Sequence, residues 1–571
     1  MTELAGPRTV TGHRQRTALN PAQWRWGIAA TLISAVSLMP IVALAIIALM
    51  PAENIWPHLV ANVLPVAVRT SIGLMAGVGL ITLLVGTSTA WLVTMCRFPG
   101  RAMFEWLLLA PLAMPTYITA YCYVEVFDYA GPLQSSLRYL FGWENAAAYW
   151  FPEIRSLGGA IFVMAIVLYP YVYLTARASF LAQSVCLLDV SRTLGRSARA
   201  TFFSIALPLA RPALIAGVTL ALMETINDIG AVEFFGVRTL TFSVYSTWLG
   251  RGNLSGAAQL AGVLFVFVFA LIWIERRSRQ HQRFHLTSSK YQPLPAYRLG
   301  RIAGLAASLA CALPIVLGMF IPFAVLLRYA LPRMDALTAS SYLTYAGNSI
   351  FLSLAAAVLA VSAALLLVYA RKLIRARWMH NLTWLASIGY AIPGTVLAIG
   401  VLIPLAAFDN GLDGWMRNMF GISTGLVLSG TSIAIILTYT IRFLAVAHGS
   451  IDAGMGKLSP HLAMASRTLG RSAGRTLLQV QLPLIRPALV AAGLLVFVDG
   501  MKELPATILL RPFNFETLAT HVYSYASLER FEDAAIAALT IVMVGLIPVI
   551  LLNRAARMAF RPGKQDLPGA P

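Results

Sequence analysis

Two stretches of the sequence, residues 191–217 and 466–492, decide the fold. The first window reads SRTLGRSARATFFSIALPLARPALIAG and the second window reads SRTLGRSAGRTLLQVQLPLIRPALVAA. At a constant offset of 275 residues the two windows are identical at 17 of 27 positions. Identity at a fixed period is typical of an internal repeat. The 571-residue chain is therefore predicted to consist of two homologous halves.

Each window has the composition of a helix–turn–helix connection. Gly195 and Gly470 can adopt positive φ, so each can end one short helix and let a second helix begin at an angle. Pro208 and Pro483 are predicted to stop that second helix. A well-packed connector is one interpretation, but a connector does not need such identity in two otherwise diverged halves. A surface that must fit the same partner twice does need it.

The composition outside the windows is that of a membrane protein. Hydrophobic residues make up 58% of the chain, charged residues only 12%, and the mean hydropathy is +0.74. Soluble domains are about 45–50% apolar and about 25% charged, so an ordinary soluble enzyme is excluded. Twelve apolar stretches are long enough to cross a bilayer. They lie near 26–50, 70–94, 103–127, 157–181, 212–235, 254–274, 302–327, 347–370, 382–406, 424–446, 487–510 and 534–552.

The basic residues predict the orientation of these spans. With a cytoplasmic N-terminus, the inside segments contain 32 of the 43 Lys and Arg residues and the outside segments contain 11. This is the asymmetry that the positive-inside rule expects, so the net charge of +20 does not indicate nucleic-acid binding. Both termini are predicted to be cytoplasmic. Six spans per half also place both halves in the same orientation, as a parallel repeat.

These patterns predict an all-α polytopic membrane protein with five segments. The segments are a cytoplasmic N-terminal segment (1–25), the first six-span half (26–275), a basic cytoplasmic linker (276–300), the second six-span half (301–553) and a cytoplasmic tail (554–571).

The windows resemble a loop of the binding-protein-dependent ABC importer permeases. That family has Glu-Ala-Ala, three residues, Gly, nine residues, Ile, any residue and Leu-Pro in this loop, and both windows fit the spacing. The sequence has Asp189 and Met464 where the family has Glu, and Ser191 and Ser466 where it has Ala. The resemblance implies that the loop is a coupling helix seated in a groove of an ATPase subunit. The implied coupling residues are Asp189, Ser191, Arg192, Gly195, Pro208, Ser466, Arg467, Gly470 and Pro483.

Three further segments, 110–134, 227–248 and 502–526, look like those of the fused ferric-iron permeases in that family. The resemblance implies uptake of Fe(III) across a bacterial inner membrane, with two ATPase subunits and a periplasmic binding protein as partners. Thiamine and other small-solute permeases share the architecture and remain alternatives. No GxxxxGK[ST] loop occurs in the sequence, so ATP hydrolysis is expected in a separate subunit, and no cofactor is expected. An ion-coupled secondary transporter is the rival class, but it leaves the duplicated loop unexplained.

Acidic residues occur in the fifth and eleventh predicted spans. Glu224 matches Asp499 and Asp228 matches Glu503 at the offset of 275. A charge at the centre of a membrane costs roughly 2.5–3.5 kcal/mol on insertion scales, so such residues usually face a bundle interior or a water path. We therefore expect these four acids to line a path for a cation. Two other interpretations stay open: shorter spans would leave the acids at the interface, and Lys502 could simply neutralise Asp499.

Overall fold

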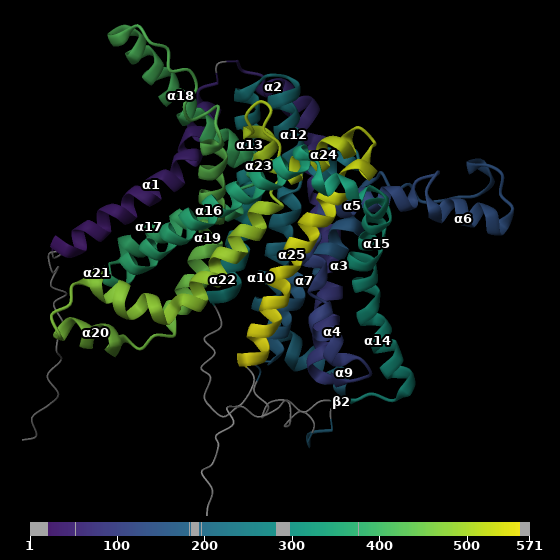
Figure 1. Cartoon of the computed structure of the whole chain (residues 1–571). Coiled ribbons are helices and arrows are strands. Elements are labelled where there is room, and N and C mark those ends of the chain that lie inside the picture. The colour runs from purple at the N-terminus through teal and green to yellow at the C-terminus, as the bar shows by residue number, and fades with distance from the viewer. Residues whose placement is uncertain are drawn as a thin grey trace, which may run out of the picture.

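The fold is described from a computed structural model, which covers residues 21–51, 53–181, 183, 193–195, 197–280, 297–374 and 376–559. Nearly all of the described chain is helical (Figure 1). The helices of the first half are α1 (Pro21–Leu49), α2 (Trp56–His58), α3 (Leu64–Met95), α4 (Arg101–Leu107), α5 (Thr116–Phe127), α6 (Pro132–Phe141), α7 (Leu157–Leu181), α9 (Ala198–Thr201), α10 (Leu207–Asn227), α11 (Gly230–Phe234), α12 (Leu240–Tyr245) and α13 (Leu254–Gln280).

The second half repeats this order with some helices divided differently. Its helices are α14 (Arg301–Ile315), α15 (Ile321–Ala330), α16 (Ser340–Leu373), α17 (Arg377–Ala386), α18 (Gly394–Phe420), α19 (Ser432–Gly456), α20 (Pro460–Thr468), α21 (Ala473–Thr476), α22 (Leu482–Met501), α23 (Pro505–Leu510), α24 (Leu518–Ser527) and α25 (Phe531–Ala559). The two strands, β1 (Cys96–Arg97) and β2 (Tyr297–Arg298), pair in parallel and join the end of α3 to the start of the second half.

The number of membrane-spanning helices agrees with the predicted architecture. Eleven helices of the described chain are long and apolar enough to cross a membrane, and a bent pair raises the number to twelve. The bent pair corrects the predicted third span, 103–127, because Arg101–Ala113 and Thr116–Phe141 meet at 93°. The break lies at Met114, whose extended backbone precedes Pro115. A residue before proline is disfavoured in the helical region, which explains the break there.

The fifth and eleventh spans begin earlier and end earlier than predicted. They cover Phe202–Asn227 and Ala473–Met501 instead of 212–235 and 487–510. Each therefore continues directly from its window, through a π-helical turn at Phe202–Ala206 or Leu477–Gln481. The expectation that Pro208 and Pro483 stop a helix is wrong. Each proline lies in the first turn of α10 or α22, where a missing N–H is tolerated.

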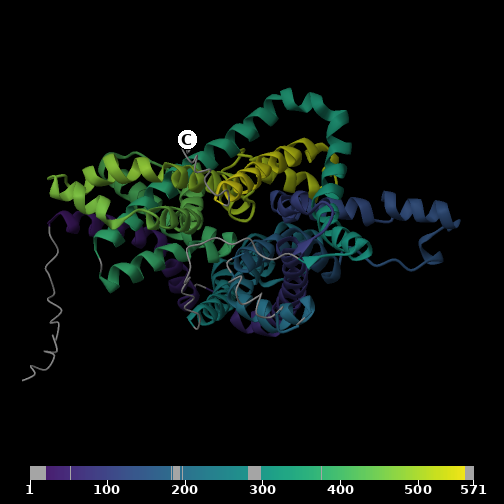
Figure 2. The ribbon, with the colours of Figure 1, turned by 90° about the horizontal axis from the view of Figure 1, so that it is seen from below.

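The first span of each half packs against the other half. Helix α1 packs on α17 and α18 of the second half, while α15 packs on α5 of the first half. Figure 2 shows α1 lying among the green helices of the second half, and α14 reaching towards the first half. The halves defined by the sequence are thus interlocked in space. Consequently one hydrophobic cluster contains buried residues of α1, α13, α16, α18, α19 and α22 together.

Gly400 tests the crossing of α1 and α18. A Cβ atom at Gly400 would lie 2.5 Å from the carbonyl oxygen of Pro40 in α1. Because backbone cannot give way as a flexible side chain can, we expect Gly400→Ala to destabilise the protein by about 1–3 kcal/mol. Gly411, also in α18, is the matched control because an added Cβ would meet no atom within 4 Å. Gly411→Ala is expected to stabilise the helix by roughly 0.5–1 kcal/mol. Thermal unfolding in detergent measures both changes, and equal melting temperatures would contradict this packing.

Candidate functional site

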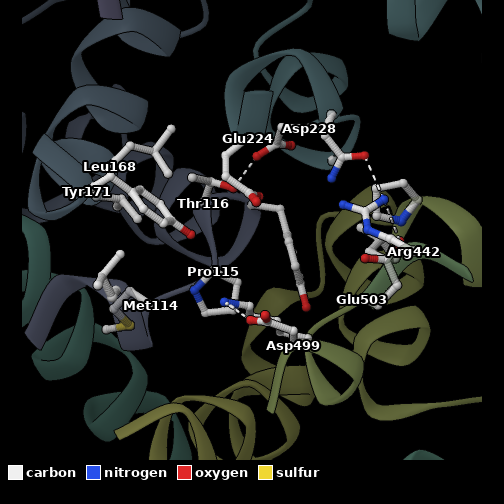
Figure 3. A pocket seen from close by; sticks show the side chains of 18 of the residues that line it. Met114, Pro115, Thr116, Leu168, Tyr171, Glu224, Asp228, Arg442, Asp499 and Glu503 are labelled. Atoms are coloured by element: carbon white, nitrogen blue, oxygen red, sulfur yellow. Dashed lines mark hydrogen bonds and ion pairs between the residues drawn. The ribbon is translucent and has the colours of Figure 1, made fainter. Parts of the chain in front are cut away.

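A cavity of about 80 Å³ lies between the two halves. Its walls come from α5, α7, α10 and α11 of the first half and from α19, α22 and α23 of the second half. The structure brings all four predicted acids to this one cavity: Glu224, Asp228, Asp499 and Glu503. In Figure 3 the first-half acids lie at the top of the cavity, with Glu503 and Asp499 opposite them. The acids therefore face a shared interior, although their role in transport stays a prediction.

Asp228 and Glu503 occupy equivalent places, just beyond the ends of α10 and α22. The chain leaves α10 at Asp228 with an extended backbone. The Asp228 carboxylate accepts a hydrogen bond of 2.8 Å from the N–H of Ala231 in α11. Likewise Glu503 accepts one of 3.1 Å from the N–H of Ala506 in α23. Unpaired N–H groups at a helix start favour a negative charge, so each carboxylate is held by the short helix that follows it.

The second partner of each carboxylate differs between the halves. The hydroxyl of Thr116 donates a hydrogen bond to Asp228. At the corresponding place the second half has Gly394, and the guanidinium of Arg442 lies 3.5 Å from Glu503. A Cβ atom on Gly394 would lie 2.4 Å from Arg442 Nη1 and 2.7 Å from Glu503 Oε1. The glycine therefore makes room for a buried ion pair that the first half does not have.

Three hydrogen bonds cross the cavity from one half to the other. The side-chain oxygen of Asn227 accepts from Arg442 Nη1 at 2.9 Å and from the Gly394 N–H at 2.7 Å. The hydroxyl of Tyr390 donates to Glu224 at 2.5 Å. These bonds join the end of α10 to α19, α18 and the turn before α18. Because separating the halves here would break all three, they hold the cavity in its present narrow form.

The cavity carries an excess of negative charge. Lys502 pairs with Asp499 at 2.9 Å, as one of the sequence interpretations allowed, and Arg442 pairs with Glu503. Among the described residues Glu224 and Asp228 form no ion pair within 4.0 Å, although Arg442 and Lys502 are near enough to Glu224 to interact with it electrostatically. In the part of the chain that the structure covers, no three His, Cys, Asp or Glu side chains converge as metal ligands do. The acids thus form an electronegative lining and not a preformed metal centre.

Sequence reasoning did not single out Arg442, Asn227 or Tyr390. Arg442 stands alone among apolar and hydroxyl residues in the first four turns of α19, and its side chain is only 4% exposed. The insertion cost that drew attention to the acids applies equally to this arginine, so it could have been found. The prediction that the fifth span, 212–235, includes Glu233 is wrong. Glu233 lies on the separate helix α11.

The glycines of the two windows adopt the conformation that the sequence predicts. φ is +73° at Gly195 and +78° at Gly470. A Cβ atom at either position would meet nothing within 4 Å. The requirement for glycine therefore comes from the backbone angle alone, since L-residues other than glycine are strained at positive φ.

The second window is held together by its own polar groups. The hydroxyls of Ser466 and Thr476 lie 3.0 Å apart and are buried. The N–H of Gly470 donates to the carbonyl of Arg467 at 3.0 Å, which closes the turn. Ser466 thus has a structural partner where the family has alanine. Of the first window, Asp189, Ser191 and Arg192 lie outside the described residues.

Both windows present apolar side chains at equivalent positions. Leu194 and Leu469, which are 275 residues apart, are 73% and 80% exposed. Phe203 and Leu478, with the same spacing, are 67% and 61% exposed. Exposed apolar side chains therefore recur at equivalent positions of the two windows.

Comparison with known proteins places this architecture in a family. Residues 82–282 match the model of the binding-protein-dependent transport system inner membrane component. A Fe(3+)-transport system permease protein of Haemophilus influenzae is 26% identical over 82% of this chain and 86% of its own length. A ferric transport system permease protein of Actinobacillus pleuropneumoniae is 22% identical over 90% of this chain and 75% of its own length.

A shorter relative matches over one part only. A molybdenum transport system permease protein of Escherichia coli is 29% identical over 34% of this chain and 86% of its own length. The family match in the first half, the window that repeats in the second half and the eleven or twelve spans all agree. The chain is therefore a permease subunit of a binding-protein-dependent ABC importer, with both permease halves in one polypeptide.

Proposed function

We propose that this permease carries Fe(III) inward across a bacterial inner membrane, along a path between its two halves. The observation that carries the proposal is the convergence of Glu224, Asp228, Asp499 and Glu503 on one cavity. Two of the four carboxylates have cationic partners, and the other two leave a formal excess of negative charge. A negative lining attracts a cation and repels an oxyanion such as molybdate. The names of the two full-length relatives support the same cargo.

The size of the cavity also favours an ion. Pockets for organic ligands usually measure about 300–1,000 Å³, far more than the cavity here. Carboxylate and hydroxyl oxygens are the ligands that hard cations prefer. The ion pairs of Lys502 and Arg442 limit the number of free carboxylates, so a cation would be attracted without being trapped.

The windows are proposed as the attachment sites for two ATPase subunits. Their support is the shared turn at Gly195 and Gly470 and the equivalent exposed pairs, Leu194 with Phe203 and Leu469 with Leu478. Two like surfaces on one chain fit a partner that is present twice. In this arrangement the windows and both termini face the cytoplasm, and a periplasmic binding protein delivers the cargo at the opposite end. Nucleotide binding would then move the windows and the spans joined to them as rigid bodies.

Replacing the cavity acids with neutral isosteres tests the proposal that Fe(III) is the transported ion. We expect Glu224→Gln and Asp228→Asn to reduce uptake of radioactive Fe(III) severalfold per assembled complex, because neither carboxylate is neutralised by an ion pair among the described residues. Asp499→Asn and Glu503→Gln are expected to reduce uptake as well, with a fall in protein level for Glu503→Gln because Arg442 loses its counter-charge. Asp413→Asn, at the far end of α18, is the control and leaves uptake unchanged. Unchanged uptake in all four variants would contradict an acidic path.

A further inference from the structure

A second repeat lies at the end of the bundle away from the windows. Residues 239–245, TLTFSVY, and 517–523, TLATHVY, share Thr, Leu, Val and Tyr at an offset of 278. Thr239 and Thr517 cap the helices α12 and α24 through their side chains. Figure 1 shows these two helices close together at the top of the view.

The structural surroundings of the two helices repeat as well. The N–H of Leu240 donates to Ser71 at 2.9 Å, and the N–H of Leu518 donates to Ser349 at 2.8 Å. Both the leucines and the serines are 278 residues apart, and the serines lie on the equivalent spans α3 and α16. The helices α12 and α24 are thus anchored in the same way in each half, which makes Tyr245 and Tyr523 equivalent residues.

These equivalent tyrosines touch each other. The hydroxyl oxygens of Tyr245 and Tyr523 lie 3.4 Å apart. In a molecule of two equivalent halves, equivalent atoms can meet only where the pseudo-two-fold axis passes between them. A path enclosed by the two halves follows that axis, so the tyrosine pair lies across it.

A single carboxylate joins the pair. Glu233 accepts a hydrogen bond of 2.6 Å from the hydroxyl of Tyr523. Its counterpart in the second half, counted from the equivalent Asp228 and Glu503, is Ile508, so the carboxylate is present in one half only. Glu233 lies on α11, and Gly230 at the start of the same helix lines the acidic cavity. Glu233 lies three positions after Gly230, or about 4.5 Å along a helix.

We propose that Tyr245, Tyr523 and Glu233 form the gate that closes the transport path at the end opposite the ATPase windows. The inference rests on the proposed direction of transport, and it adds the residues that an entering ion must pass. Two phenol oxygens and one carboxylate make a set of hard donors on the axis, which suits a hard cation better than an oxyanion. In the present conformation the tyrosine contact closes this end above the acidic cavity.

Cysteine labelling tests the gate without any cargo. The native cysteines (Cys96, Cys122, Cys186 and Cys311) would be changed to alanine, and Leu112, which lines the cavity, to cysteine as the reporter. The complete importer in intact cells is then treated with a membrane-impermeant maleimide from outside. We expect Tyr245→Ala with Tyr523→Ala to increase the labelling rate severalfold. Tyr525→Ala is the matched control on α24, because this ring packs at a tilt against His521 and takes no part in the contact between Tyr245 and Tyr523.

The result that would overturn the gate is an unchanged labelling rate in the double variant, with unfolding excluded by size-exclusion chromatography. The donor set is tested separately with Glu233→Gln, which keeps the shape of the side chain. This variant is expected to leave labelling low and to reduce Fe(III) uptake severalfold, and full uptake would overturn the ligand role. Should the parent importer carry no Fe(III), the cargo assignment fails, while the labelling result still decides the gate.

Discussion

The double variant Gly195→Val with Gly470→Val is expected to lose ATP-driven transport while the protein still inserts and folds. Both glycines have φ above +70°, where a side chain costs roughly 1–2 kcal/mol per residue. A penalty of that size changes the population of the native turn by about five- to thirty-fold at each window. Because the two windows are proposed to bind two ATPase copies, the double variant should be worse than either single variant. Co-purification of the ATPase and uptake per complex are the measurements.

The second window supplies a matched control for this experiment. Gly474 lies four residues beyond Gly470 in α21, and an added Cβ would also meet nothing within 4 Å there. Its φ is not positive, and the first window already has Arg199, a residue with a long side chain, at the equivalent place. Gly474→Ala should therefore leave coupling intact. Wild-type transport in the double valine variant would contradict the assignment of the windows as coupling helices.

Much of the fold could be predicted because its signals are local in the sequence. A sufficiently long apolar stretch predicts a membrane span wherever it occurs in the sequence. The identity of the two windows defines two halves without any knowledge of packing. The positive φ at Gly195 and Gly470 is likewise a local property of one residue in a turn. The bend before Pro115 could also have been predicted from the local sequence, since proline restricts the backbone of the residue that precedes it.

Packing between the halves could not be predicted in the same way. A membrane helix such as α1 is apolar on all sides, so its sequence does not show which neighbour it contacts. Its crossing with α18 depends on Gly400, whose meaning becomes clear only when Pro40 is seen beside it. The contact of Tyr245 with Tyr523 has the same origin, because it requires the position of an axis that no short segment defines.

Some residues of the candidate site could be predicted from the sequence, and others could not. The four acids were predicted from their cost in a membrane, and the structure brings them together. The hydrogen bonds between halves come from Asn227 and Tyr390, which are neutral and therefore carry no comparable cost in the sequence. These neutral residues make the bonds that opening the cavity must break. The sequence therefore identifies the charged residues that line the cavity, but it does not identify the neutral residues that form the bonds between the halves.

Arg442→Met is expected to be the most damaging single change in the cavity. The side chains of Arg442 and Glu503 are 4% and 6% exposed, and the arginine also donates to Asn227 across the halves. Removing one partner of a buried ion pair leaves an uncompensated charge and typically costs about 3–5 kcal/mol. Thermal unfolding and the amount of assembled complex should both fall. Arg417→Met is the control, because Arg417 forms an exposed ion pair with Asp413 on α18 and little change is expected.

A second variant separates charge balance from packing. Arg442→Met with Glu503→Gln removes both charges, so no buried ion is left without a partner. Buried ion pairs replaced by neutral groups often retain or gain stability, and we therefore expect this double variant to recover most of the loss. Its transport should remain low, because one carboxylate of the path and one bond between the halves are missing. If the double variant is as unstable as Arg442→Met, then the arginine stabilises the fold through Asn227 and its packing, and not through Glu503.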